Sequence, residues 1–445
     1  MTFEEARQYL IGTINETVSR RQPGRLERMR ALLRHLGNPQ DRYPTLHIGG
    51  TSGKGSTCTM AASALHAQGL CVGLHTKPHL RSVTERAQVD GVPIGEAPFA
   101  DLLEEMLPAI DAAAGEEGRP SYYETLLALA FLHFARQHVD VAVIEVGVGG
   151  TLDGTNVLCP EVTAITNVGF DHMEILGDTL EKIAYDKAGI AKPGIPLVSD
   201  VDRPEARAVI ESRCADVRAP FLSVRDLVRV EPRSGTGRHG QQALVTTPAA
   251  EYRIDLPLLG GFQLRNAATA ILVLEQLREG LRPPVEAVEK GLAEVSLAGR
   301  VESYPSRPVV VFDVAHNPDK ARALASALRE EWPNRRFTFV VGIAAGKDAG
   351  EMIAAWALLP ASFIFTSFEV PGRPATRLQR LQAYAHAQGR VSRAINDPVE
   401  ALAVARRMAE ADDVVVVTGS TFVVAVLREW WLANVSTVSS PRSQV

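Results

Sequence analysis

The sequence predicts an α/β protein in two parts: a P-loop domain built on a parallel sheet, followed by a smaller Rossmann-like C-terminal domain. Three observations predict it. A strand, a glycine-rich loop and an alanine-rich helix follow one another over residues 43–68. Apolar runs alternate with amphipathic segments from residue 43 onward, and a second alternation of this kind starts at residue 308. Such alternation is typical of a parallel sheet with helices on both faces.

Composition and charge narrow the class of protein. A chain of 445 residues suggests two domains, and 46% apolar with 22% charged residues is typical of a soluble globular protein. The net charge of −5 gives no reason to expect a nucleic acid or an anionic membrane as partner. The four cysteines form no C-x-x-C pair and read as thiols in a reducing compartment. With no secretory signal in the first ten residues and no apolar run of membrane-spanning length, we expect a cytoplasmic protein.

The stretch that organises the first domain is the glycine-rich loop after the apolar run Leu46–Ile48. Glycines allow backbone N–H groups to turn toward an anion, and the helix start adds unpaired donors and partial positive charge. A lysine can reach the outer phosphates, and a following hydroxyl can bind Mg²⁺. The predicted phosphate-binding residues are Gly50, Thr51, Gly53, Lys54, Gly55, Ser56 and Thr57.

This loop differs from the common G-x-x-x-x-G-K-[ST] pattern. Ile48 occupies its first position, and Gly55 stands between Lys54 and Ser56. An ordinary turn between a strand and a helix is therefore the alternative. The strand before the loop and the helix after it favour phosphate binding.

The elements around the loop follow from hydrophobic spacing. Residues 3–37 predict two helices, the second over 24–37 and ending at Gly37-Asn38-Pro39. Further strands are expected at 71–76, 139–147, 162–168 and 196–200, with helices at 123–137 and 179–191 among them. Ligands of a parallel sheet bind beyond the carboxyl ends of its strands.

The rest of the chain divides near residues 296–300. Residues 226–256 predict an antiparallel flap with a mobile tip at 231–242, and helices at 264–279 and 285–295 close the first domain. We expect domains at 1–297 and 298–435 and a disordered tail at 436–445. The second domain is expected to have strands at 309–314, 337–343, 362–368, 391–395 and 413–418, and helices at 319–331, 348–358, 376–388, 398–410 and 421–433. No G-x-G-x-x-G follows its first strand, which argues against a dinucleotide site.

Four stretches place unusual polar residues at element ends. Glu145 ends an apolar strand, where a carboxylate is costly unless it meets a cation; a capping role is the alternative. Asp171-His172 follows the strand at 162–168, and His172 is either structural or a metal ligand. Asp186-Lys187 lies late in a helix, where a lysine also favours the helix dipole. The second domain opens with Asp313-Val314-Ala315-His316-Asn317-Pro318, whose polar side chains are suited to contact a ligand. Asn317 before Pro318 also fits a helix N-cap.

In order and spacing, these stretches resemble the folylpolyglutamate synthase and dihydrofolate synthase family of the Mur-ligase superfamily, over about residues 20–430. The similarity is carried by LERMRALLRHLGNPQ (26–40), GTSGKGST, EVGVGG-x-LDGTN, the DH to DKAGI stretch (171–196), GGFQLRNAATA (260–270), GR-x-E (299–302), DVAHNP and TGS (418–420). The resemblance implies a P-loop Mur-ligase-like ATP-binding domain and a C-terminal glutamate-ligase domain.

The resemblance also implies an activity and a set of site residues. In this family ATP phosphorylates the carboxylate of a pteroate or folate, and the amine of L-glutamate attacks the acyl phosphate. The implied cofactors are ATP and Mg²⁺, with Lys187 at the position of a lysine that becomes carbamylated. The implied catalytic residues are Lys54, Glu145, His172 and Lys187, and the implied metal ligands are Ser56, Thr76, Glu145 and His172. Further ATP contacts are Asn266, Arg300, Asp313 and His316. The pterin-side residues are Ser121, Tyr122, Tyr123, Glu124, Leu152, Asp153 and Gly154.

The sequence departs from the family pattern at several positions. Lys77 stands where the family usually has a Mg²⁺-ligating serine, and an ammonium cannot coordinate a metal. Either Thr76 supplies the hydroxyl, or Lys77 takes over part of the metal's charge. Thr151 stands in place of a frequent arginine, Phe262 in place of a common histidine and Asp186 in place of a glutamate.

Three hypotheses follow. The first is an ATP-dependent ligase that adds glutamate to folates, to dihydropteroate, or to both. The second is a paralogous Mur-type ligase that joins a different amino acid and acid. The third is a non-catalytic nucleotide-binding relative. We expect a monomer that acts on small molecules, with no nucleic acid or membrane partner.

Overall fold

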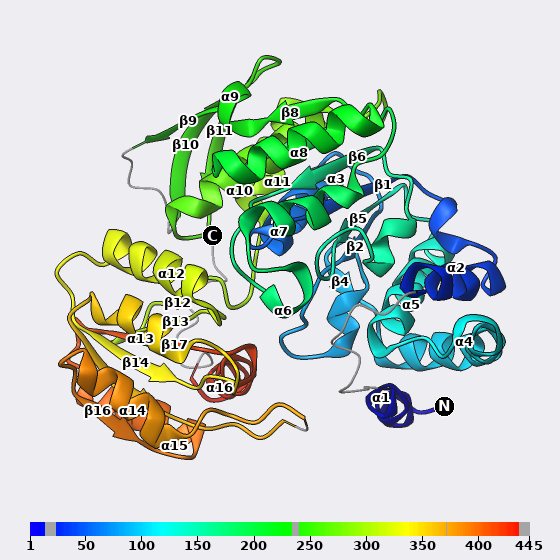
Figure 1. Cartoon of the computed structure of the whole chain (residues 1–445). Coiled ribbons are helices and arrows are strands. Elements are labelled where there is room, and N and C mark those ends of the chain that lie inside the picture. Colours follow the sequence, from blue (N-terminus) through cyan, green and yellow to red (C-terminus); the bar gives the residue numbers. More distant parts are fainter. Residues whose placement is uncertain (14–23, 234–239, 371, 436–445) are drawn as a thin grey trace, which may run out of the picture. The chain divides into compact units, whose positions relative to one another are not determined.

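The computed structural model describes residues 1–13, 24–233, 240–370 and 372–435. The predicted tail (436–445) and half of the predicted flap tip (234–239 of 231–242) therefore lie outside the described residues. By internal contacts the chain forms two compact units (Figure 1). Unit 1 comprises Met1–Pro257 and Phe262–Ser296, and unit 2 comprises Leu258–Gly261 and Leu297–Val445. The sequence did not indicate that residues 258–261 group with the second unit.

Unit 1 is built on an eight-stranded sheet in the order β4-β3-β2-β5-β1-β6-β7-β8. All neighbours from β2 to β8 pair in parallel, and only β3 and β4 are antiparallel. The strands are β1 (Thr45–Gly49), β2 (Val72–His75), β3 (Gln88–Val89), β4 (Val92–Pro93), β5 (Val141–Glu145), β6 (Val162–Ile165), β7 (Leu197–Ser199) and β8 (Phe221–Ser223). The predicted α/β class with a parallel sheet is confirmed.

The helices of unit 1 pack in apolar clusters. One cluster joins the first helices of the chain to α4, α5 and residues Ala142 and Ile144 of β5, and a second joins α7 and α8 to Ile165 of β6. The helices are α1 (Phe3–Gly12), α2 (Arg25–His35), α3 (Lys54–Ala67), α4 (Glu96–Glu117), α5 (Tyr122–Arg136), α6 (Met173–Leu176), α7 (Leu180–Lys187), α8 (Pro204–Val217), α9 (Val224–Leu227), α10 (Gly261–Glu275) and α11 (Val285–Glu294). The short 3-10 turns are η2 (Pro39–Asp41), η3 (Val83–Arg86), η4 (Gly154–Val157) and η5 (Ala188–Ile190).

Unit 1 differs from the prediction in several details, and its strands β3, β4 and β8 were not predicted. The 22-residue helix α4 was not predicted; it contains Pro108, which interrupts a helical pattern in a sequence. The helix expected at 179–191 ends at Lys187 and continues as η5. The helix expected from 264 begins at Gly261.

The predicted flap is a separate antiparallel sheet in the order β11-β10-β9. Its strands are β9 (Arg229–Arg233), β10 (Gln241–Thr246) and β11 (Glu251–Leu256). Burial alternates along β11, as expected for a sheet with one face against the core.

Unit 2 carries a six-stranded sheet in the order β12-β13-β17-β14-β15-β16, parallel except for β12. Its strands are β12 (Glu302–Tyr304), β13 (Val309–Phe312), β14 (Phe337–Val341), β15 (Ala361–Phe365), β16 (Ser392–Ala394) and β17 (Val414–Thr418). Its helices are α12 (Pro318–Glu331), α13 (Ala349–Ala357), α14 (Leu378–Ala387), α15 (Pro398–Met408) and α16 (Thr421–Asn434). Only the antiparallel edge strand β12 was not predicted.

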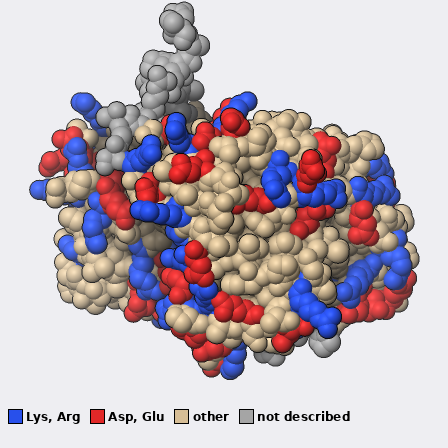
Figure 2. Space-filling model, turned by 90° about the horizontal axis from the view of Figure 1, so that it is seen from above, with Lys and Arg blue, Asp and Glu red and all other residues tan. Residues whose placement is uncertain are grey.

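Figure 2 shows lysine and arginine side chains interspersed with aspartate and glutamate on the face in view, without a large area of one sign. Among the described residues, every helix is too short or too polar to cross a lipid bilayer.

Candidate active site

The glycine-rich loop connects β1 to α3 and is confined by two neighbouring segments. Gly50 (φ 139°) and Gly53 (φ 81°) adopt backbone angles that favour glycine. A Cβ on Gly50 would overlap Thr166 Oγ1, and a Cβ on Gly53 would overlap Asn266 Oδ1. Since Asn266 comes from α10, that helix and the segment after β6 shape the loop together.

Asn167 holds the first part of this loop. Its Oδ1 accepts hydrogen bonds from Thr51 N (3.1 Å) and Ser52 N (2.7 Å). The Thr51 hydroxyl accepts from Gly169 N at 3.0 Å. These amides are therefore committed to the loop itself, whereas the amides in the first turn of α3 have no intrahelical acceptor and form the positive end of the helix.

Two lysines meet at one carbonyl of the loop. Lys54 Nζ donates to Gly50 O at 2.9 Å, and Lys187 Nζ donates to the same oxygen at 3.0 Å. Lys187 ends α7 and its residue is only 4% exposed. Burial, followed by the positive charge of Lys54, lowers the pKa of Lys187 to about 7, against the opposite effect of Asp171 and Asp186. The prediction from sequence placed Lys187 at a helix end; the fold brings it to the phosphate loop.

Glu145 lies beside the same loop. Its residue is 3% exposed, and its Oε2 accepts a hydrogen bond from Lys77 N at 2.9 Å. A Cβ on Gly55 would stand 3.4 Å from Glu145 Oε2, so this carboxylate faces the first turn of α3. Burial, followed by the positive charge of Lys54, lowers the pKa of the Lys77 ammonium to about 8, and the charge of Glu145 acts in the opposite direction. The carboxylate thus has the cationic surroundings that its burial requires.

Two hydroxyl residues complete the first turn of α3, and a third lies after β2. Ser56 and Thr57 are buried, and Thr57 Oγ1 has no hydrogen-bond partner among the described residues. Thr76 directly precedes Lys77 and is half-buried. Ser56 directly follows Gly55, the residue of α3 that lies against Glu145.

His172 lies in the loop after β6, immediately before α6. It takes a left-handed conformation (φ 51°) before α6, and its Nδ1 lies 3.6 Å from Glu174 Oε1. Asp171 Oδ1 accepts from His172 N at 3.0 Å. Within the described ranges, no group of three His, Cys, Asp or Glu side chains is arranged to hold a metal. The charge of Asp171 acts on Lys187, so this loop lies near the end of α7.

The predicted pterin-side carboxylates are bound within the protein. Glu124 accepts from Arg28 Nε and Nη2, both at 2.8 Å, and from the backbone of Ser121, which caps α5. Asp153 accepts from Tyr123 OH at 3.0 Å. It also accepts from Val148 N, Thr155 N and Thr155 Oγ1. Both carboxylates therefore hold their loops in place.

The remaining pterin-side residues lie around these carboxylates. The Tyr122 ring lies 5.8 Å from the guanidinium carbon of Arg86, and Leu152 is half-buried beside the buried Gly154. The sequence prediction missed Asn167 and Thr166. The available signal was their position as polar residues directly after the carboxyl end of β6, the rim on which ligands of parallel sheets bind.

In unit 2, three predicted nucleotide contacts lie together. Asp313 accepts from Val301 N (3.0 Å) and Ala315 N (2.8 Å), and burial raises its pKa while Arg300 acts in the opposite direction. His316 Nδ1 lies 2.8 Å from Val314 O. Asn317 caps α12, with its Oδ1 accepting from Lys320 N, so the capping role considered for it is present.

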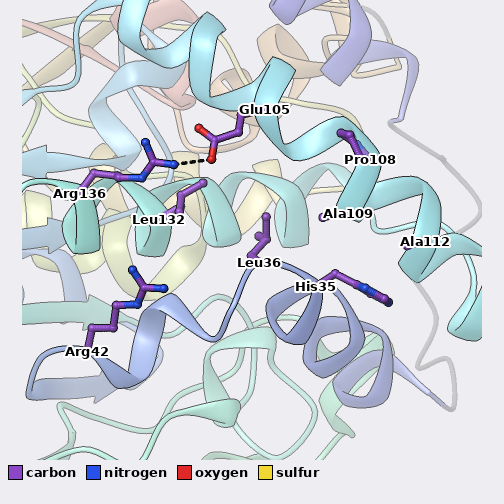
Figure 3. A pocket seen from close by; sticks show the side chains of 9 residues that line it. All are labelled: His35, Leu36, Arg42, Glu105, Pro108, Ala109, Ala112, Leu132 and Arg136. Atoms are coloured by element: carbon purple, nitrogen blue, oxygen red, sulfur yellow. Dashed lines mark hydrogen bonds and ion pairs between the residues drawn. The ribbon is translucent and has the colours of Figure 1, made fainter.

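A separate pocket of about 370 Å³ lies among α2, α4 and α5 (Figure 3). Figure 3 shows its Arg136 guanidinium bonded to the Glu105 carboxylate. The pocket contains none of the predicted site residues. Its lining is His35, Leu36, Arg42, Glu105, Pro108, Ala109, Ala112, Leu132 and Arg136.

Comparison with known proteins places the chain among the Mur ligases. Residues 48–274 match the Mur ligase middle domain, and residues 299–421 match the Mur ligase glutamate ligase domain. The chain is 32% identical to a Bacillus subtilis dihydrofolate synthase/folylpolyglutamate synthase, over 96% of this chain and 98% of that protein.

Solved structures agree. A Mycobacterium tuberculosis folylpolyglutamate synthase complexed with ADP superposes with a TM-score of 0.88 at 30% identity, covering 96% of this chain and 98% of the other. E. coli FolC in complex with DHPP and ADP superposes with a TM-score of 0.85 at 28% identity, covering 97% and 98%. Fold and loop are those of a Mur ligase. The chain belongs to the folylpolyglutamate synthase/dihydrofolate synthase family, which confirms the resemblance seen in the sequence.

Proposed function

We propose that this protein is an ATP-dependent ligase that adds L-glutamate to folates, to dihydropteroate, or to both. The observation that carries the proposal is the gathering of Lys54, Lys187, Lys77 and Glu145 at one glycine-rich loop. The names and bound ligands of the similar proteins support a folate-type acid and an adenine nucleotide.

The proposed reaction has two steps. A carboxylate oxygen of the pteroate or folate attacks the γ-phosphorus of ATP, and ADP leaves. The amine of glutamate then attacks the acyl carbon, inorganic phosphate leaves, and the amine gives up a proton as the amide forms. Both steps bring anions together, so the site must offset negative charge and align the reactants. Lys54 and the first amides of α3 suit the phosphates.

We assign the nucleotide to the predicted residues of each unit. In unit 1 these are the loop residues and Asn266, which lies against Gly53. In unit 2 they are Arg300, Asp313 and His316. Thr51 is assigned a shaping role in the loop, because its amide and hydroxyl bond to Asn167 and Gly169.

Mg²⁺ fits the donors present. Mg²⁺ is usually held by one or two carboxylates together with phosphate oxygens and waters, and Glu145 with the Ser56 hydroxyl supplies such a partial set. Thr76 and His172 are the further proposed ligands. When bound, the ion would offset charge on the transferring phosphoryl group.

Lys187 is the proposed site of carbamylation. A neutral amine is the form that adds CO₂, and burial brings the pKa of Lys187 to about 7, so a large neutral fraction is present near neutral pH. Exposure to ¹³C-labelled bicarbonate should give a carbamate signal in the ¹³C NMR spectrum of the wild type that Lys187→Met lacks.

The test of the ligase proposal is a reconstituted reaction. Full-length protein with ATP, Mg²⁺, L-glutamate and either dihydropteroate or tetrahydrofolate should release phosphate only when both organic substrates are present. Lys54→Ala and Glu145→Ala should each lower turnover by at least about 100-fold, the scale of losing one electrostatic contact in an active site. Lys290→Ala, on the exposed side of α11, is the matched control and should keep full activity.

Two results would count against the proposal. Absence of turnover with every pterin acceptor would exclude a folate ligase and leave another Mur-type ligase or a nucleotide-binding relative. Substantial residual activity in Lys54→Ala would refute its role. The monomeric state and the cytoplasmic location stay predictions.

A further inference from the structure

Lys77 is a third cation at the loop, and it is held there by the fold. It follows β2 and is half-buried, and its backbone N–H donates to the Glu145 carboxylate at 2.9 Å. That carboxylate also faces the first turn of α3 at Gly55. One buried group therefore fixes the backbone of Lys77 beside the start of the helix that follows the glycine-rich loop.

The carboxylates near the Lys77 ammonium are already engaged by other hydrogen-bond donors, so they do not fully offset its positive charge. Lys54, Glu145, Asp153 and Arg86 act on it, and its own charge acts on Lys187. Both oxygens of Asp153 already accept hydrogen bonds from Tyr123, Thr155 and Val148. Glu145 is the remaining carboxylate, and its Oε2 accepts from Lys77 N and faces the helix start at Gly55.

The three lysines differ in what their Nζ atoms bind. Those of Lys54 and Lys187 both donate to Gly50 O. Among the described residues, none accepts a hydrogen bond from Lys77 Nζ. Like charges brought together in partly buried surroundings are costly unless a counter-charge joins them. The arrangement is suited to a multiply charged anion.

We propose that Lys77 is a binding residue for the β- and γ-phosphates of the nucleotide, a fixed positive charge that allows the triphosphate to bind without a divalent metal. The inference rests on the proposed use of ATP. It assigns Lys77 a direct contact with phosphate instead of a role in coordinating metal, which an ammonium cannot perform.

Calorimetric titration of the full-length protein with ATP in EDTA tests the proposal, and AMP serves as the nucleotide without outer phosphates. Lys77→Met should weaken ATP binding in EDTA by at least about tenfold, the scale of one lost charge-assisted hydrogen bond. AMP binding should stay within about twofold, because the lost contact is to the outer phosphates. Lys77→Arg keeps the charge and should retain most of the affinity for ATP.

Lys290→Met is the matched control, since it removes an exposed lysine of unit 1. Circular dichroism and thermal unfolding of each variant check the fold. Wild-type affinity for ATP in Lys77→Met would overturn the inference, and so would an equal loss for AMP and ATP. Absence of ATP binding by the wild type, with or without Mg²⁺, would instead overturn the proposed function together with the inference.

Discussion

The Gly50 carbonyl links two lysines, the half-buried Lys54 and the buried Lys187, to the glycine-rich loop. Its carbonyl accepts from Lys54, four residues along the chain, and from Lys187, 137 residues away. Because a Cβ at this position would overlap Thr166 Oγ1, the carbonyl can take this orientation only on a glycine. At this scale, one backbone oxygen determines where two ammonium groups lie.

The burial of Lys187 predicts a pH-dependent stability. The unfolded chain holds the lysine proton up to a pKa of 10.5, whereas the folded state releases it at about 7. Between these values the unfolded state binds more protons, so wild-type stability rises with pH in that window. The full penalty is present below pH 7 and disappears above 10.5. Lys187→Met should therefore be more stable than wild type at pH 7, by up to about 5 kcal/mol, and the advantage should shrink toward pH 10.

Urea unfolding of both proteins at pH 7, 8.5 and 10, in buffers depleted of CO₂, measures this difference. Lys77, whose pKa burial lowers to about 8, is present in both proteins, and its positive charge is one of those that lower the pKa of Lys187. A stability difference independent of pH would show that Lys187 titrates normally.

Among the elements, α2 and α5 are joined by a buried ion pair. Arg28 of α2 and Glu124 of α5 form two hydrogen bonds of 2.8 Å, and the same carboxylate caps α5 through Ser121 N. Tyr123 lies in the first turn of α5 and donates to Asp153. The ion pair that anchors α5 therefore sets the position of the proposed pterin-side segments. A residue predicted as a substrate contact acts in the structure as an anchor between helices.

Arg28→Met should destabilise the protein by about 3–5 kcal/mol, because it leaves a buried carboxylate without its partner. The double variant Arg28→Met/Glu124→Met should lose less than the single variant. Chemical denaturation of the set gives the coupling energy. Arg30→Met removes an arginine from the same helix whose pair with Glu27 is exposed, and it should change stability by less than about 1 kcal/mol. Equal effects of the Arg28 and Arg30 variants would contradict the anchoring role.

At the scale of the whole molecule, each compact unit has a sheet and a core of its own. Unit 2 stacks Phe339 against both Trp356 and Phe363, with ring centroids 5.7 Å and 5.5 Å apart. Its parallel strands β13, β17 and β14 are almost entirely buried. A unit of this size with a continuous core meets the usual requirements of an independent domain.

A fragment of residues 297–435 should therefore fold by itself. We expect an α/β circular dichroism spectrum and a single cooperative thermal transition, followed by tryptophan fluorescence, to which the buried Trp356 and Trp431 contribute. ATP should not raise its melting temperature as it does that of the full chain, since the fragment lacks the glycine-rich loop. A spectrum of an unfolded chain would show that unit 2 depends on unit 1.

The sequence by itself determined the class of fold, the order of the main elements, the glycine-rich loop between β1 and α3, and the family. These depend on local spacing: an apolar run, glycines and a helix start lie within 26 residues of each other at 43–68. Three-dimensional packing alone decided that Lys187 shares a carbonyl with Lys54, that Lys77 bonds to Glu145, and that Glu124 and Asp153 are occupied by protein donors. Such contacts join residues far apart along the chain. They arise when strands pair and helices dock, and no local pattern of residues encodes them.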